Sequence, residues 1–256
     1  MRFSVLGSGS RGNAVYIESG GSAILIDAGF SGKEMEKRLA LIGRNLQSVA
    51  GICLTHEHND HIKGAGVLSR RLKVPLYANY GTLASSEKTV GKVHGYREFE
   101  TGDTFQIGDL QVRSFRISHD SADPVGFVIS DRDCSLGYLT DTGKVSHLME
   151  SRLTGCSGLI LEFNHNLDML KNGPYPLPLQ QRVRSSLGHL CNEDAADFLD
   201  RLLPAKKLRH VVLAHLSEQN NTPQLAVRAY QESKNNCPQV RGHVASQGAP
   251  TAIIEL

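Results

Sequence analysis

The segment THEHNDH at residues 55–61 constrains this chain more than any other part of its sequence. It places three histidines and an aspartate within six positions, directly after the apolar run VAGICL. Because residues two apart in an extended chain point the same way, His56 and His58 can reach one metal ion together. We expect a helix to begin after them, where Asp60 and His61 can face a second ion. The spacing differs from the HExxH motif of metalloproteases, whose histidines lie four positions apart on a helix.

Other histidines and aspartates stand at the ends of predicted strands. His119 follows SFRIS, Asp141 follows LGYLT and His215 follows VVLA. Loops converge to form sites at the strand ends of open sheets, so we expect these side chains to join the 55–61 cluster. We predict two sets of metal ligands: His56, His58 and His119 in one set, and Asp60, His61 and His215 in the other. Asp141 lies between the two sets in this prediction, because a carboxylate can bind one metal with each oxygen.

The ligand types also bear on the cofactor. A pair of metal ions lowers the pKa of water, which can then attack near neutral pH. Imidazole combined with carboxylate suits zinc, manganese and iron. The sequence therefore predicts two divalent metal ions as the cofactor, and the residue types leave the identity of the metal open.

The remaining sequence predicts a layered α/β domain. Strand-like runs separated by Gly- and Ser-rich turns open the chain, residues 96–140 are rich in predicted strands, and the second half alternates helices with strands. Two sets of strands with helices outside both predict a single αββα sandwich domain over residues 1–256. The segment KNGPYPLPLQQRVRSS has three prolines in five residues, and we predict that it becomes helical only after Leu179.

The composition predicts a cytoplasmic enzyme. No apolar run reaches the roughly 18 residues of a membrane span, and the opening MRFSVLGSGS is typical of a first strand rather than of a signal peptide. The five cysteines are scattered without a CxxC pair, which favours reduced thiols over a disulfide framework. The net charge of +2 neither requires nor excludes nucleic acid, because the charge that binds it is local.

The ligand pattern resembles that of the metallo-β-lactamase fold superfamily. The H-x-H-x-D-H stretch matches its first metal ligands, and His119, Asp141 and His215 match the later ones. Asp27 in LIDAG resembles the aspartate that supports the histidine loop without binding metal. Further segments, among them GSGSRGN, SHDSADPVGF, GPYPLPLQQR and GHLCNEDAADFL, resemble the YycJ/WalJ group of bacterial proteins over nearly the whole chain. Cys191 in GHLCN stands where serine is expected in this group.

This resemblance implies a metal-dependent phosphodiesterase that acts on DNA, with manganese as the favoured metal. A 5′-to-3′ exonuclease of duplex DNA with a role in repair is the function that follows. Because one fold serves many reactions, a small-molecule hydrolase of thioesters, lactones or cyclic phosphodiesters is the alternative. Basic residues that lead into the site would favour the nuclease, and a closed apolar pocket would favour the hydrolase. A regulatory metal protein without turnover fits less well, because structural sites normally close four ligands around one ion.

His189 and Asp60 are the predicted catalytic residues. His189 precedes a predicted helix N-terminus, a place that favours bound anions. The segment GHLCNEDAADFL also resembles the one that sets a histidine against the scissile phosphate in tRNA-processing nucleases. His189 is therefore the candidate that protonates the leaving oxygen. A histidine that caps the helix, or that is buried in a loop, is the alternative.

Six residues are predicted to contact the substrate. The loop GSGSRGN can present backbone N–H groups and an arginine to a phosphate backbone, although it can also be a plain turn between strands. His165 in LEFNHN, together with Glu162 and Asn164, can line the same cleft or hydrogen-bond a metal ligand. The predicted substrate contacts are Ser8, Ser10, Arg11, Asn13, His165 and Arg182. Between Asp141 and His215 there is no room for a large inserted domain, so we expect loops or the second subunit of a homodimer to hold long DNA.

Overall fold

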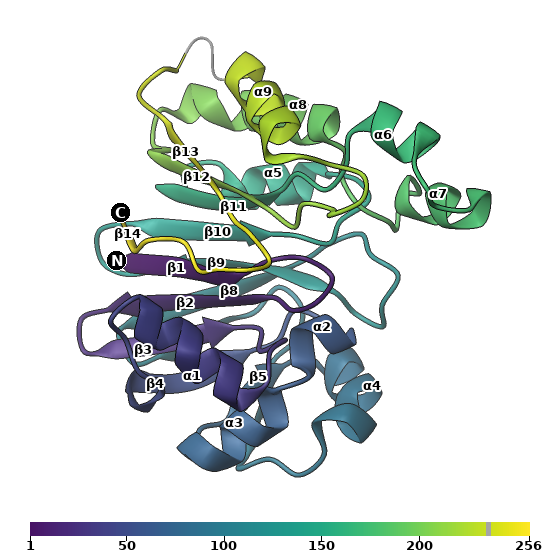
Figure 1. Ribbon diagram of the computed structural model, residues 1–256. Helices are drawn as coiled ribbons and strands as arrows, with labels where there is room; N and C mark the ends of the chain where they lie inside the picture. Colours follow the sequence, from purple (N-terminus) through teal and green to yellow (C-terminus); the bar gives the residue numbers. More distant parts are fainter. Residues whose placement is uncertain (234–236) are drawn as a thin grey trace.

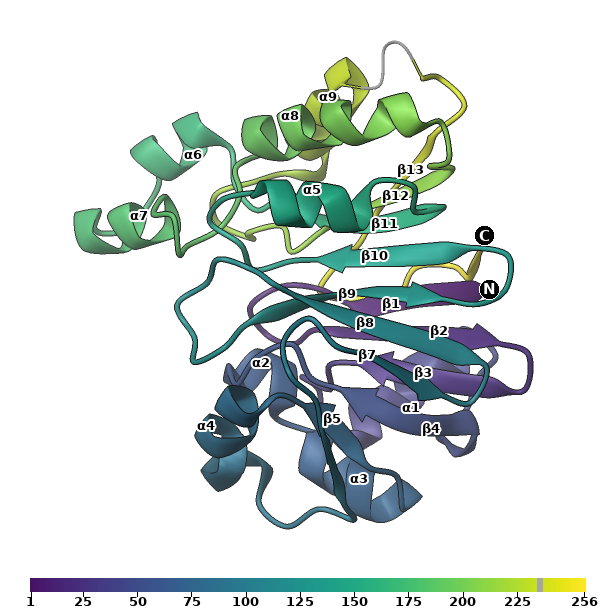
Figure 2. The ribbon, with the colours of Figure 1, turned by 180° about the vertical axis from the view of Figure 1, so that it is seen from behind.

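Two mixed β-sheets packed face to face form the centre of the molecule, and helices cover the outer side of each sheet (Figures 1 and 2). The computed structural model describes residues 1–233 and 237–256. The predicted αββα sandwich with a single domain is confirmed. Within the described ranges, no helix is both long and apolar enough to cross a membrane.

The first sheet comes mainly from the N-terminal part of the chain. Its strands lie in the order β14 (Ile254–Glu255), β1 (Arg2–Gly7), β2 (Ala14–Ser19), β3 (Ser22–Ile26), β4 (Val49–Cys53), β5 (Leu76–Ala78) and β6 (Tyr96–Glu98). Pairing is antiparallel from β14 to β3 and parallel from β3 to β6. The helices that belong to this half are α1 (Gly32–Leu41), α2 (Asn59–Ile62), α3 (Ala65–Leu72) and α4 (Tyr80–Val90), with a 3-10 turn at Leu46–Ser48.

The second sheet repeats this arrangement. Its strands lie in the order β13 (Arg241–Val244), β12 (His210–Ala214), β11 (Gly158–Glu162), β10 (Ser135–Leu139), β9 (Val125–Ser130), β8 (Leu110–Arg116) and β7 (Thr104–Ile107). Pairing is antiparallel from β7 to β10 and parallel from β10 to β13. The helices of this half are α5 (His147–Leu153), α6 (Leu167–Asn172), α7 (Leu177–Val183), α8 (Asn192–Leu202) and α9 (Pro223–Ser233), with a 3-10 turn at Leu203–Ala205.

The core consists of three apolar layers. Ile17, Phe127 and Val212 lie in the layer between the sheets, Phe198 lies in the layer on the side of α5, α8 and α9, and Leu68 lies in the layer on the side of α1 and α3. Central strands are therefore covered on both faces, and every residue of β11 is buried. This explains why the parallel strands are continuous apolar runs in the sequence instead of alternating patterns.

The direction of the strands brings distant residues to one edge. Strands β10, β11 and β12 are parallel, and β8 runs the same way because β8 and β10 both pair antiparallel with β9. The segments that follow these strands contain His119, Asp141 and His215. In the first sheet, parallel β3 and β4 precede Asp27 and His56 in the same manner.

The loop after β3 packs directly against the histidine loop. Ala28 N–H donates to the carbonyl of His61 at 2.7 Å, and Gly64 N–H donates to the carbonyl of Ala28 at 2.7 Å. A Cβ atom on Gly29 would lie 1.6 Å from the carbonyl oxygen of Asp60, so only glycine allows this approach. The backbone of residues 58–64 is therefore held in place before any ligand binds.

Some helix boundaries differ from the sequence prediction. Helix α7 begins at Leu177, three residues before Gln180, where the prediction started it, and it carries Pro178 in its first turn. Proline is tolerated there because the first N–H groups of a helix have no partner within the helix. Helix α4 was absent from the prediction, although the side chain of Asn79 caps it by accepting from Thr82 N–H at 3.0 Å.

Candidate metal centre

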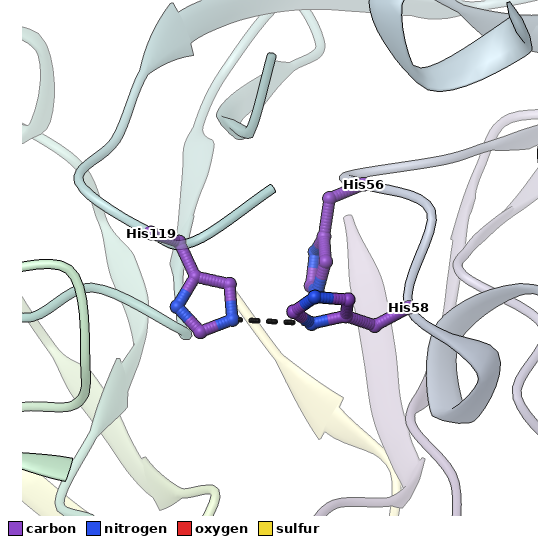
Figure 3. A group of neighbouring side chains, drawn as sticks. All are labelled: His56, His58 and His119. Atoms are coloured by element: carbon purple, nitrogen blue, oxygen red, sulfur yellow. Dashed lines mark hydrogen bonds between the residues drawn. The ribbon is translucent and has the colours of Figure 1, made fainter. Parts of the chain in front are cut away.

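Three histidines from two parts of the sandwich face one another (Figure 3). The ring centroid of His56 lies 4.6 Å from that of His58 and 5.1 Å from that of His119. The centroids of His58 and His119 lie 5.0 Å apart. His58 Nδ1 and His119 Nε2 are separated by 3.3 Å. One nitrogen from each ring lies within 4.8 Å of the others, which is close enough to hold a metal ion.

A second group lies beside the first. Asp60, His61 and His215 each offer one ligand atom within 4.8 Å of the other two. Asp141 stands between their rings: its Oδ2 is 3.5 Å from His61 Nε2, and its Oδ1 is 3.4 Å from His215 Nε2. Asp141 also forms a group with His56 and His61, so it touches both predicted ligand sets. The structure thus brings together all seven residues that the sequence predicts as ligands.

Three atoms at the centre of this cluster are buried without hydrogen-bond partners in the described part of the chain. They are His56 Nε2, Asp141 Oδ2 and His215 Nε2. Buried polar atoms are almost always paired, since an unpaired one costs about 1–3 kcal/mol. Two imidazole lone pairs and a carboxylate oxygen are donors for a divalent cation, so the cluster is able to bind metal ions.

Asp27 orients the rings of the histidine loop. This fully buried carboxylate accepts from Thr55 N–H at 2.9 Å and lies 2.7 Å from His61 Nδ1. Thr55 Oγ1 donates to Asp27 and lies 2.9 Å from His56 Nδ1, so it can accept the proton of that nitrogen. Both rings are then left with Nε2 as the free donor atom. This is the supporting position that the resemblance implies for Asp27.

Glu162, which the sequence groups with His165 as able to hydrogen-bond a metal ligand, does the same from the second sheet. Its Oε1 lies 2.8 Å from His189 Nδ1 and 2.9 Å from His215 Nδ1. Its Oε2 accepts from the backbone N–H groups of Thr142 at 3.0 Å and Leu190 at 3.2 Å. The signal in the sequence was a glutamate at the end of the apolar strand GLILE.

The charges of the buried groups depend on one another. Burial disfavours charge on His61 and His215, but neighbouring carboxylates outweigh it and raise their pKa to about 10 and about 9. Burial likewise disfavours a charged Glu162, yet the hydrogen bonds and charge of His189 and His215 lower its pKa to about 2. The pKa of Asp141 is held well below its usual range against burial, by His215 and then by His61. In the metal-free protein His61 and His215 therefore keep protons that a bound cation would displace.

Three site residues have left-handed backbone conformations. The φ angles are 60° at Asp27, 58° at Asp141 and 57° at His215, each just after a strand. Such conformations are uncommon for residues other than glycine and persist where surrounding contacts hold them. At His215 one such contact is the backbone N–H, which donates to Ser8 Oγ at 2.8 Å. The turn redirects each side chain from the sheet towards the centre.

Several predicted substrate contacts lie elsewhere. Ser8 is buried against the backbone of His215, and Asn13 is buried with its Nδ2 donating to Asp60 Oδ2 at 3.1 Å. Ser8 thus supports the backbone of His215, and Asn13 supports Asp60 in the histidine loop. His165 is also buried, and burial lowers its pKa to about 4. All three side chains are thus enclosed by the protein in this structure, and their contact with DNA stays a prediction.

The other predicted contacts surround a cleft beside the centre. The cleft has a volume of about 320 Å³, and its lining includes Ser10, Arg182, His189 and His215. Arg182 Nε donates to Asp120 Oδ2 at 2.7 Å. Arg11 pairs with Glu218, which also lines the cleft, so an acidic partner holds each of the two arginines.

His189 lies between the cleft and the ligand cluster. Its ring centroid is 5.2 Å from that of His119 and 5.2 Å from that of His215. Its side chain is 23% exposed, whereas that of His215 is 5% exposed. Since Nδ1 faces Glu162, the other ring nitrogen is the one available to a group bound in the cleft.

The two sheets and the histidine–aspartate cluster define a protein of the metallo-β-lactamase fold. A family model described as the beta-lactamase superfamily domain matches residues 22–215. The chain belongs to this superfamily.

Its relatives include two named nucleases. The chain is 40% identical over 228 residues to the Exodeoxyribonuclease YycJ of Bacillus anthracis, and this match covers 88% of this chain and 86% of that protein. It is 41% identical over 229 residues to the Exodeoxyribonuclease WalJ of Streptococcus pneumoniae, and this match covers 88% of this chain and 85% of that protein. Among solved structures, the metallo-β-lactamase fold protein YhfI of Bacillus subtilis has a TM-score of 0.74 at 16% identity, over 98% of both chains. This last likeness concerns the fold.

Replacing Asp27 by asparagine tests its support of the histidine loop. Asparagine keeps the size of the side chain and tolerates a left-handed backbone, but it removes the charge and one acceptor oxygen. We expect Asp27→Asn to weaken metal binding about 10- to 100-fold, measured by competition with a chelating indicator. The exposed Asp133→Asn is the matched control and should bind metal as the wild type does. Equal affinity in Asp27→Asn would contradict the role assigned to this carboxylate.

The free energy of unfolding of the metal-free protein should fall as the pH rises above neutrality. Folded His61 and His215 keep their protons up to a pKa of about 10 and about 9, whereas an unfolded histidine loses its proton near pH 6.5. The stabilisation that these two protonated histidines contribute is complete below about pH 6.5. It is lost as the pH rises through their pKa values in the folded protein. The slope is up to about 1.4 kcal/mol per pH unit for each histidine. Urea unfolding in the presence of a chelator, repeated at several pH values between about 7 and about 10, measures this slope.

The control for this prediction removes one of the two groups. His61→Gln should show a shallower loss of stability than the wild type over the same pH range, because only His215 then remains with a raised pKa. Substitution of the exposed His94 by alanine should leave the slope unchanged. A His61→Gln slope equal to that of the wild type would show that His61 is not charged in the metal-free protein.

Proposed function

We propose that this chain is a metal-dependent nuclease that removes nucleotides from the ends of DNA. The observation that carries the proposal is its similarity, over 88% of its length, to two proteins named exodeoxyribonucleases. The cleft beside the ligand cluster supports it, since Arg182 and the Arg11–Glu218 pair lie at its rim. We assign a 5′-to-3′ direction on duplex DNA and a cytoplasmic role in DNA repair as the finer parts of this proposal.

The proposed cofactor is a pair of divalent metal ions, with manganese favoured over zinc and iron. His56, His58 and His119 would hold one ion, and Asp60, His61 and His215 the other, with Asp141 between them. Bound ions would lower the pKa of the attacking water and neutralise charge on the phosphate. The unpaired buried atoms of His56, Asp141 and His215 support this assignment.

The chain's own side chains supply the proton transfers in this proposal. Asp60 Oδ2, held by Asn13 Nδ2 at 3.1 Å, accepts the proton of the attacking water. His189 donates a proton to the leaving oxygen from the nitrogen that faces away from Glu162. Its Nδ1–H stays with Glu162 Oε1, so the imidazole ends the step neutral and correctly oriented. Arg182 can exchange its bond to Asp120 for a bond to a phosphate.

The alternative reading is a hydrolase of small molecules. A thioester or lactone would suit a closed, mainly apolar pocket. The observed cleft instead includes Asp120, Arg182, His189 and Glu218 among its lining residues. This polar lining does not match a closed apolar pocket, and Arg182 is the lining side chain that can pair with a phosphate.

Hydrolysis of end-labelled DNA tests the proposed function. Duplexes labelled at the 5′ or the 3′ end are incubated with purified protein and manganese, zinc, iron or chelator, with Asp141→Ala and a labelled RNA in parallel. We expect metal-dependent release of nucleotides from the 5′ end by the wild type and none by Asp141→Ala. Stable DNA and RNA under every metal condition would contradict the proposal and favour the small-molecule hydrolase.

His189→Ala separates proton transfer from metal binding. We expect this substitution to lower kcat about 10²- to 10⁴-fold, the usual contribution of a general acid, while the metal content stays unchanged. Steady-state cleavage and elemental analysis of the same samples measure the two effects. His94→Ala, at an exposed histidine, is the control and should keep full activity. Full turnover in His189→Ala would remove this residue from the mechanism.

A further inference from the structure

The helices α6 and α7 stand out from the sandwich (Figures 1 and 2). Helix α7 contributes Leu179, Arg182 and Val183 to the cleft lining, and Tyr175 in the preceding proline-rich segment lines it too. Leu179 and Val183 are four residues apart and share a helix face. Together with the ring of Tyr175 they give one wall of the cleft an apolar surface. The proposed proton transfers and metal ligands leave this wall without a role.

The backbone holds Tyr175 firmly in position. Pro174 and Pro176 flank it and restrict the chain, and Gln180 Nε2 donates to the carbonyl of Tyr175 at 2.9 Å. At the start of the segment, a Cβ atom on Gly173 would lie 2.7 Å from Asn220 Oδ1 and 2.5 Å from the carbonyl of Met169. The segment therefore packs closely on its neighbours and presents Tyr175 with little conformational freedom.

The ring of Tyr175 is open to a ligand. Over residues 1–233 and 237–256, it stacks on no other aromatic ring, and its hydroxyl has no hydrogen bond. The same cleft reaches His189 and His215 at the metal centre, and Ser10, Ser217 and Gln219 add polar groups to its lining. A molecule that fits this cleft has a flat apolar part and a polar part close to the metal centre.

We propose that Tyr175 stacks on the base of the terminal nucleotide while the phosphate of that nucleotide lies at the metal centre. The proposal rests on the proposed nuclease function. The volume of about 320 Å³ is at the lower end of the range for small-ligand pockets, so it suits one nucleotide and not a base pair. The terminal base must therefore leave the duplex, and stacking on Tyr175 replaces the stacking that it loses. Because every base has a π-face, the contact tolerates any sequence.

Removal of the tyrosine and removal of the base, singly and together, test the contact. Wild type and Tyr175→Ala are compared on duplexes whose terminal nucleotide is either normal or abasic. We expect Tyr175→Ala to lower kcat/KM about 10- to 100-fold on normal DNA and much less on abasic DNA. Tyr175→Phe should restore the wild-type value on normal DNA. Equal losses on both substrates would overturn the proposal, since Tyr175 would then act through the fold.

A second readout does not depend on turnover. Stacking on an aromatic ring quenches 2-aminopurine, so this base at the duplex end should be less fluorescent when bound to the wild type or Tyr175→Phe than when bound to Tyr175→Ala. Tyr96→Ala, at an exposed tyrosine of β6, is the matched control and should behave as the wild type. DNA cleavage with equal quenching by wild type and Tyr175→Ala would overturn the stacking proposal alone. Absence of both cleavage and quenching by the wild type would overturn the nuclease proposal with it.

Discussion

Two buried carboxylates hold the imidazole rings of the metal centre, one from each sheet. Asp27, after β3, accepts from His61 Nδ1, and Glu162, at the end of β11, accepts from His215 Nδ1. Each histidine then presents Nε2 to Asp141, at 3.5 Å for His61 and 3.4 Å for His215, and His61 Nε2 also lies 3.0 Å from Asn13 Nδ2. The geometry of the centre therefore depends on how the two sheets pack, because neither sheet holds both rings.

The fold supports this arrangement at a cost in local backbone energy. The left-handed conformations of Asp27, Asp141 and His215 each cost about 1–3 kcal/mol in general. Burial of carboxylates and imidazoles adds a further cost unless they are paired. The apolar layers on both sides of the sheets and the hydrogen bonds of Ser8 and Asn13 offset these terms. The unpaired atoms that remain at the centre are the ones that a cation would satisfy.

The sequence predicts the fold and the residues that gather, since both are visible in local patterns. His56, Asp141 and His215 each follow an apolar run whose end marks a strand end. It does not predict the supporting contacts, because these join residues far apart in the chain. Ser8 reaches the backbone of His215, 207 positions later, and the pattern around GSGSRGN indicated substrate contact instead. The sequence places Glu162 beside His165 as able to hydrogen-bond a ligand, but tertiary packing decides that its two imidazole partners are His189 and His215.

The metal content of purified protein tests the two-ion centre most directly. After loading with manganese or zinc and removal of excess metal, elemental analysis is carried out on the wild type, His58→Ala and Asp60→Ala. The structure places His58 only in the three-histidine group and Asp60 only in the second group. With two ligand groups, we expect two ions per chain in the wild type and one ion per chain in each variant. A single ion in the wild type, or two ions in both variants, would contradict it.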